Sequence, residues 1–110
     1  MKKLKFRNIK TVIDGIKFAS KKESKRYLDL ELMQKDGLIS ELQLQEKFLL
    51  IPKQEGERAC HYVCDFSYIE NGIRIIEDVK SVATKKLPGY ILKRKMMLFF
   101  HGIKIREVVR

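Results

Sequence analysis

The chain has 110 residues, of which 45% are hydrophobic, so it can enclose one hydrophobic core but not two. Its 24 Lys and Arg against 14 Asp and Glu leave a formal net charge of +10, which favours a polyanionic partner. No apolar run approaches the roughly 20 residues that a membrane span needs, and the basic start Met1–Lys5 lacks the apolar stretch of a secretory signal. We therefore expect one cytoplasmic domain, residues 1–110, that acts away from membranes.

Apolar periodicity and turn-forming residues predict seven elements. In chain order they are a hairpin at residues 11–18, a helix at 20–36, strands at 44–51, 59–69 and 73–80, a helix at 90–101 and a strand at 103–109. Glycine ends both helices, at Gly37 and Gly102, and Asn71-Gly72 is the strongest two-residue hairpin signal in the chain. Without the N-terminal hairpin the order is αβββαβ. This order predicts an α/β fold, with a three-stranded meander, helices packed on it and a final added strand.

The turn at Asn71-Gly72 determines which residues of the flanking strands face each other. Residue 70 faces residue 73, and the same count brings Asp65 opposite Asp78. Theirs is a non-hydrogen-bonded pair, with Cα atoms roughly 4.5 Å apart. Like charges directly opposite one another destabilise a sheet, so the pair needs compensation. A divalent cation, Mg²⁺ or Mn²⁺, would supply it, because such ions prefer carboxylate oxygens.

Lys80 lies two residues beyond Asp78, so strand alternation places both side chains on one face. Two carboxylates and an ammonium suit phosphodiester hydrolysis, in which a metal polarises the phosphate and ionises a water. The lysine would position that water or stabilise the transition state. Glu77 points to the opposite face and is a weaker candidate. The alternative is an ordinary salt-bridged surface cluster; the facing Asp65 and the net charge favour catalysis.

Glu23 has two interpretations. Ser20-Lys21-Lys22-Glu23 matches a capping box, in which Glu23 bonds back to the Ser20 amide. However, Glu23, Tyr27 and Leu30 form one helix stripe that should face the sheet, where a carboxylate needs a partner such as the metal. Spacing alone leaves the two interpretations even.

Together these residues resemble the PD-(D/E)XK nuclease superfamily, with Asp65 and Asp78-Val79-Lys80 on the second and third core strands and Glu23 on the first helix. More narrowly, four stretches between residues 18 and 100 resemble a phage-encoded family of small nucleases known as a domain of unknown function. The stretches are Phe18–Glu23, Gly37–Gln45, Tyr62–Phe66 and Glu77–Lys80. The chain departs from the superfamily label in two ways. Cys64 replaces the proline before the first Asp, and the second acid, Asp78, is Asp rather than Glu.

The resemblance implies a restriction-endonuclease-like αβββαβ core and a Mg²⁺-dependent nuclease. Asp65 and Asp78 would be metal ligands, Glu23 a further acid at the metal, and Lys80 the catalytic lysine. Gln45 would line the site, although a solvent-facing strand residue explains it nearly as well. Small members of the superfamily are similar to Holliday-junction resolvases, which act on DNA as homodimers. No small-molecule cofactor is expected.

We therefore expect a metal-dependent DNA endonuclease, structure-selective in the manner of a Holliday-junction resolvase and derived from a phage or prophage. The first alternative is a non-catalytic, basic nucleic-acid-binding domain that kept the nuclease fold; an RNA-associated accessory protein would rest on charge alone. A binding domain would need exposed aromatic residues for stacking, whereas Tyr62, Phe66 and Tyr68 share one strand face and are expected to be core. Lys93 and Arg94 are candidate phosphate contacts, with a solvated helix face as the alternative.

The helix at residues 90–101 contains the apolar run Met96–Phe100, which encircles its axis because consecutive positions point about 100° apart. One sheet covers only one side of a helix, so we expect a second cover. The first helix, the N-terminal hairpin or another subunit would provide it, and the pattern favours none of these. A homodimer would place two Asp65–Asp78 sites in a fixed relation, as paired incisions across a junction require.

Overall fold

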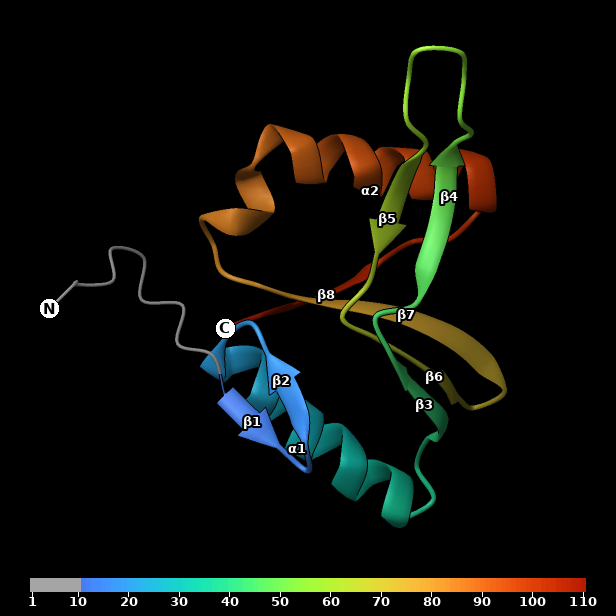
Figure 1. Ribbon diagram of the computed structural model, residues 1–110. Helices are drawn as coiled ribbons and strands as arrows, with labels where there is room; N and C mark the ends of the chain where they lie inside the picture. The colour runs from blue at the N-terminus through green and yellow to red at the C-terminus, as the bar shows by residue number, and fades with distance from the viewer. Residues whose placement is uncertain (1–10) are drawn as a thin grey trace, which may run out of the picture.

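The computed structural model describes residues 11–110 (Figure 1), and Met1–Lys5, considered above for a secretory signal, lies outside them. The elements are, in chain order, β1 (Thr11–Ile13), β2 (Ile16–Phe18), α1 (Lys21–Lys35), β3 (Ser40–Leu44), β4 (Lys47–Ile51), β5 (Cys60–Val63), β6 (Phe66–Glu70), β7 (Ile73–Lys80), a 3-10 turn η1 (Thr84–Lys86), α2 (Pro88–His101) and β8 (Arg106–Val109). The predicted α/β fold and its N-terminal hairpin, β1–β2, are confirmed. None of the described helices is long and apolar enough to cross a membrane.

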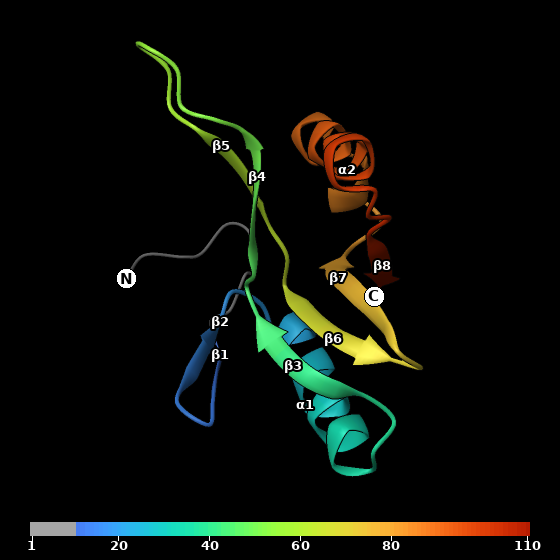
Figure 2. The same ribbon diagram turned by 90° about the vertical axis from the view of Figure 1, so that its right-hand side faces the viewer.

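A four-stranded sheet in the order β3-β6-β7-β8 forms the centre of the fold. β3, β6 and β7 are antiparallel neighbours, whereas β8 lies parallel to β7. The parallel pair is possible because η1 and α2 carry the chain back along the sheet between the two strands. Figure 2 shows α1 and α2 on opposite sides of this sheet and β4–β5 rising from it as a separate hairpin.

Each side of the sheet has its own hydrophobic core, so the expectation of a single core is wrong, because the sheet separates the buried apolar residues into two clusters. The core on the α1 side contains Phe18, Tyr27, Leu30, Ile39, Phe66 and Tyr68. The core on the α2 side contains Phe48, Leu50, Tyr62, Cys64, Ile76, Met97 and Ile105. β7 contributes to both cores because its side chains alternate between the two faces, Ile75 and Val79 toward α1 and Ile76 toward α2. The same alternation places Asp78 and Lys80 on the α2 side.

The first strand of the predicted meander, residues 44–51, corresponds to β4, and the strand before it, β3, was not predicted. The second, residues 59–69, bends and divides into β5 and β6. This bend lies beside the one between β3 and β4: the N–H of Gln45 donates to the carbonyl of Asp65 (3.1 Å) and that of Cys64 to the carbonyl of Glu46 (3.1 Å). Gln45 has a left-handed backbone (φ 54°), which non-glycine residues adopt rarely. The prediction of one uninterrupted strand at 59–69 is therefore wrong, and so is the placement of 44–51 in the central sheet, because β4 and β5 leave that sheet to pack on the α2 side.

The same bends separate the three aromatic residues that were predicted to share one strand face. Tyr62, Phe66 and Tyr68 are all buried, as expected of core residues. However, Tyr62 packs on the α2 side, while Phe66 and Tyr68 pack on the α1 side. The shared face is therefore wrong, since the bend at Cys64-Asp65 interrupts the alternation of the strand.

Both helices lie close to their predicted positions. α1 is capped by Ser20, whose Oγ accepts a hydrogen bond from the N–H of Glu23 (3.2 Å), and it is followed by Gly37. α2 begins at Pro88, two residues before the predicted start, because proline suits the first turn of a helix. It ends at Gly102, whose left-handed backbone (φ 66°) closes the last turn.

The C-terminal half of α2 is covered on one side only. Met97 is fully buried against the sheet side, whereas Leu98, Phe99 and Phe100 are 55%, 81% and 53% exposed. Of the three covers considered, neither α1 nor the N-terminal hairpin covers a second side of this helix among the described residues. The reason is geometric: α1 lies on the opposite face of the sheet, and β4 contacts only the side of α2 that faces Phe48 and Leu50.

Candidate functional site

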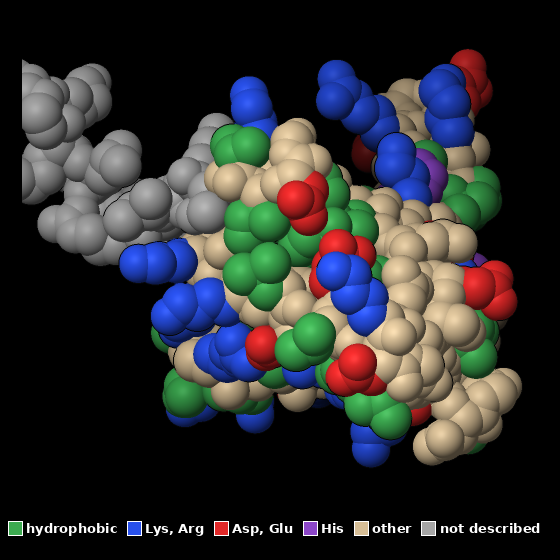
Figure 3. Space-filling view, turned by 90° about the horizontal axis from the view of Figure 1, so that it is seen from below, with side chains coloured by type: hydrophobic (Ala, Val, Ile, Leu, Met, Phe, Trp, Pro, Cys, Tyr) green, Lys and Arg blue, Asp and Glu red, His purple; other side chains and the backbone are tan. Residues whose placement is uncertain are grey.

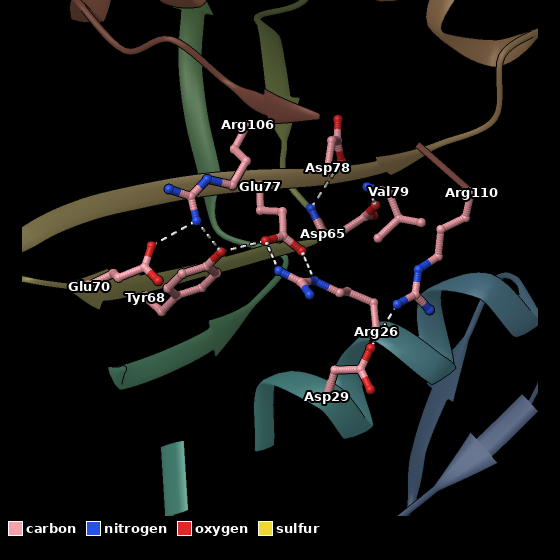
Figure 4. Close-up of polar contacts among 10 residues, drawn as sticks. All are labelled: Arg26, Asp29, Asp65, Tyr68, Glu70, Glu77, Asp78, Val79, Arg106 and Arg110. Atoms are coloured by element: carbon pink, nitrogen blue, oxygen red, sulfur yellow. Dashed lines mark hydrogen bonds and ion pairs between the residues drawn. The ribbon is translucent and has the colours of Figure 1, made fainter. Parts of the chain in front are cut away.

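The β6–β7 hairpin brings the two predicted carboxylates together. Its five strand pairs run from Glu70↔Ile73 to Phe66↔Glu77, which is the register expected from the turn. Asp65 lies in the bend just before β6, and one more step of the register sets it beside Asp78 (Figure 4). The N–H of Asp65 donates to Asp78 Oδ1 (3.2 Å), and the N–H of Val79 donates to Asp65 Oδ2 (2.8 Å). Each carboxylate is thus oriented by the backbone of the other strand.

Asp78 is almost fully buried, with 2% of its surface exposed. The hydroxyl of Tyr62 donates to Asp78 Oδ2 (2.6 Å), and Lys80 Nζ lies 3.6 Å from the same oxygen. Burial, followed by repulsion from Asp65, raises the pKa of Asp78 to about 7, although Tyr62 and Lys80 both lower it. Without a further cation, this carboxylate is therefore about half protonated near pH 7.

Asp65 and Glu23 form the second part of the cluster. Burial, followed by interaction with the neighbouring Glu23, raises the pKa of Asp65 to about 6. Glu23 is itself buried, and its Oε1 accepts a hydrogen bond from the N–H of Ala19 (3.2 Å) rather than from that of Ser20. The predicted bond to the Ser20 amide is thus wrong, although Glu23 still accepts a hydrogen bond at the helix start and lies beside Asp65; its role at a metal stays a prediction.

The donor set fits a hard divalent cation. Three carboxylates follow one another in the order Glu23, Asp65 and Asp78, and Lys80 lies near the last of them. Burial and interaction with a neighbouring carboxylate raise the pKa values of Asp65 and Asp78. As they stand, no three His, Cys, Asp or Glu side chains among residues 11–110 are arranged to hold a metal ion. A cation would have to draw the three carboxylates closer together, and carboxylate oxygens are the ligands Mg²⁺ prefers.

Asp78 and Lys80 line a hollow of about 370 Å³ on the α2 side of the sheet, whereas Asp65 and Glu23 are not among its lining residues. Its walls are Tyr62, Val63, Asp78, Lys80, Gly89, Tyr90 and Lys93. Lys93 is thus brought to the site as predicted. Arg94 is not among the residues that line the hollow; its guanidinium lies 3.7 Å from Glu107 Oε2. Gln45 is also not brought into the hollow, since it sits exposed in the bend between β3 and β4.

A family model described as Protein of unknown function (DUF1064) matches residues 3–110. The chain belongs to this family. No curated protein and no solved structure matches it. The match includes every residue of the site described above, so Glu23, Asp65, Asp78 and Lys80 are all part of the DUF1064 domain.

Three residues of the DUF1064 site were missed by sequence reasoning: Tyr62, Tyr90 and Glu107. Lys80 Nζ lies 4.3 Å from the centre of the Tyr90 ring, and the Tyr90 hydroxyl donates to Glu107 Oε2 (2.5 Å). Glu107 is the register partner of Asp78 on β8. The sequence contains no signal for this pairing. A parallel strand follows a long crossover connection, so its register cannot be counted from a short turn.

Glu77 points away from this site, as predicted, and is fully buried on the α1 side. Its carboxylate accepts two hydrogen bonds from Arg26 (2.7 and 2.9 Å) and one from the hydroxyl of Tyr68 (2.5 Å). Arg26 lies one turn after Glu23 on α1. The ion pair therefore ties the helix that carries Glu23 to the strand that carries Asp78 (Figure 4).

Proposed function

We propose that the chain is a metal-dependent DNA endonuclease that hydrolyses phosphodiester bonds. The observation that carries the proposal is the side-by-side placement of half-buried Asp65 and buried Asp78, with Asp78 and Lys80 both lining an open hollow. Two acids and a lysine in this arrangement resemble the PD-(D/E)XK nuclease superfamily. A buried acid that a neighbouring acid repels destabilises the fold, so the placement of Asp78 at a hollow favours a catalytic role.

The residues divide the chemistry among them. Asp65, Asp78 and Glu23 would hold Mg²⁺ or Mn²⁺, which when bound polarises a phosphate and ionises a water. Lys80 lies at the edge of the hollow, where its ammonium would stabilise negative charge that develops on the phosphate. Tyr62 keeps Asp78 in one orientation by donating to Oδ2. Lys93, on the opposite wall, would contact a neighbouring phosphate of the DNA backbone.

The net charge supports DNA as the substrate. Basic side chains are scattered among acidic and apolar ones over the face shown in Figure 3, which suits contacts with phosphates along a backbone. A non-catalytic binding domain would gain nothing from two neighbouring acids, one of them buried beside Lys80. Its aromatic stacking surface is also lacking on β5 and β6, because Tyr62, Phe66 and Tyr68 are buried. Resemblance alone supports a phage or prophage origin and action in the cytoplasm.

The proposal predicts that the metal-free protein loses stability as pH rises and that Mg²⁺ restores it. The pKa values of Asp65 and Asp78, about 6 and about 7 in the folded chain, exceed the roughly 3.9 of an unfolded Asp. The folded state therefore binds more protons between roughly pH 4 and 7, and its stability falls over that range. A divalent cation replaces those protons, so Mg²⁺ should raise the melting temperature more at about pH 8 than at about pH 5.

The deciding experiment combines this thermal-unfolding measurement with cleavage of branched, duplex and single-stranded DNA in Mg²⁺, Mn²⁺ or EDTA. Cleavage should require the metal and stop in EDTA. Stronger cutting of branched DNA would support structure selectivity. Absence of cleavage on all three substrates, together with a melting temperature that Mg²⁺ leaves unchanged at both pH values, would remove the nuclease and favour the non-catalytic alternative.

We also propose that a second copy of the chain covers the exposed side of α2. Phe99, 81% exposed, is the most exposed large apolar side chain of the described residues, and Leu98 and Phe100 flank it. Light scattering at micromolar protein should therefore give the mass of a dimer, and Phe99→Glu should give that of a monomer. Leu38→Glu, at an exposed leucine that follows α1, is the matched control and should leave the dimer intact. A wild-type monomer would end the dimer proposal and leave the nuclease standing.

A further inference from the structure

We propose that Tyr90 is a positioning residue for Lys80 and that Glu107 holds Tyr90 in place for this role. The inference rests on the nuclease activity proposed above and assigns two residues to it that lie outside the acid–lysine pattern. Lys80 is the last residue of β7, and a lysine has a long, flexible side chain with many rotamers. Something must therefore keep its Nζ near the carboxylates.

Two contacts hold that ammonium. Nζ lies 3.6 Å from Asp78 Oδ2 and 4.3 Å from the centre of the Tyr90 ring. The Lys80 side chain is 22% exposed, so the contact with the ring is partly shielded from water. An ammonium over the face of an aromatic ring is attracted by the ring quadrupole, and the attraction grows when water is excluded. The ring thus restricts Nζ to the side of the hollow where Asp78 lies.

Tyr90 is in turn fixed by β8. Its hydroxyl donates to Glu107 Oε2 (2.5 Å), and Arg94 Nη1 lies 3.7 Å from the same oxygen. Glu107 stands next to Asp78 in the parallel β7–β8 pair. The first turn of α2 is therefore anchored to the strand beside the site, and the ring of Tyr90 occupies the space between Glu107 and Lys80. Neither residue needs to touch DNA to affect cleavage.

Three variants test separately the aromatic ring of Tyr90, its hydroxyl group and the carboxylate of Glu107 that anchors it. Tyr90→Phe keeps the ring and loses the bond to Glu107, Tyr90→Leu loses both, and Glu107→Gln keeps an acceptor for the hydroxyl. If the ring positions Lys80, Tyr90→Leu should lower the maximal cleavage rate about 3- to 30-fold, the range of a partly shielded cation–π contact. DNA affinity should change less than about 2-fold. Tyr90→Phe and Glu107→Gln should lower the maximal cleavage rate less than Tyr90→Leu does.

A structural role alone would give a different pattern. Leu32→Ala, at an exposed leucine of α1, is the control and should cut at the wild-type rate. In a Lys80→Ala background, measured in single turnover with excess enzyme, Tyr90→Leu should have almost no further effect, because the lysine it positions is gone. If Tyr90→Leu lowers the rate equally with and without Lys80, or cuts at the wild-type rate, the positioning role is overturned.

A nuclear magnetic resonance measurement tests the contact without any activity. Ring current from Tyr90 should shift the ε-methylene protons of Lys80 upfield in wild type and in Tyr90→Phe, and the shift should vanish in Tyr90→Leu. An unshifted wild-type signal would show that the Tyr90 ring does not lie over the Lys80 side chain, and the proposal would be overturned. A shifted signal in a protein that cuts no DNA shows instead that the proposed function has failed, and the positioning role fails with it.

Discussion

Asp78→Asn should reduce metal-dependent DNA cleavage by about 10³-fold or more and leave DNA binding nearly unchanged. A bound metal supplies several kcal/mol of transition-state stabilisation, and ~4 kcal/mol corresponds to about three orders of magnitude in rate. Asparagine has the shape of aspartate and keeps an acceptor for the N–H of Asp65, but it lacks the charge that holds a cation. DNA affinity comes mainly from basic residues elsewhere, so fluorescence anisotropy should give a similar dissociation constant.

The stability of this variant distinguishes a lost ligand from a damaged fold. The pKa of Asp78 is raised to about 7, mainly by burial, so its charge destabilises the metal-free protein at high pH. Asp78→Asn should therefore melt no earlier than wild type in EDTA at about pH 8, and Mg²⁺ should no longer raise its melting temperature. Asp29→Asn, at an exposed position on α1, is the control and should cut normally. Wild-type cleavage by Asp78→Asn would show that the assigned site is wrong.

The part of the site that sequence could predict is the part controlled by local structure. The Asn71-Gly72 turn determines its own strand register, so the neighbouring positions of Asp65 and Asp78 followed by counting. Strand alternation then placed Lys80 on the same face as Asp78. It placed Glu77 on the other face. The capped start of α1 at Ser20 was equally local. These inferences needed only the geometry of single elements.

What sequence could not predict depends on packing between distant elements. The bends at Gln45 and at Asp65 arise where β4 and β5 turn toward α2, and nothing in the local pattern of either strand marks them. Glu107 and Tyr90 reach Lys80 only because β8 joins the sheet parallel to β7. Sequence also could not predict the exposed side of α2. The apolar run Met96–Phe100 indicated a helix covered on a second side, but in the described residues that side is exposed.

The largest effect on stability is expected from Arg26→Met, on the α1 side of the sheet. This change leaves the carboxylate of Glu77 fully buried without its ion-pair partner, and only the hydroxyl of Tyr68 still donates to it. Removing one partner of a buried ion pair destabilises proteins by about 3–5 kcal/mol. A domain of this size is stable by only about 5–15 kcal/mol, so the variant should be partly unfolded near physiological temperature. Urea unfolding followed by circular dichroism would measure the loss.

Two further variants test whether the unpaired charge is the cause. Arg26→Met combined with Glu77→Leu removes both charges, and the double variant should recover much of the lost free energy, because an apolar pair of similar volume can replace a buried ion pair. Arg110→Ala breaks the exposed pair with Asp29 and should change stability by only about 0–1 kcal/mol. Because α1 also carries Glu23, metal binding should weaken in Arg26→Met and return in the double variant. Equal stability of the single and double variants would contradict this explanation. It would mean that Arg26 stabilises the fold through packing of its side chain, and that the buried charge of Glu77 is compensated by groups other than Arg26.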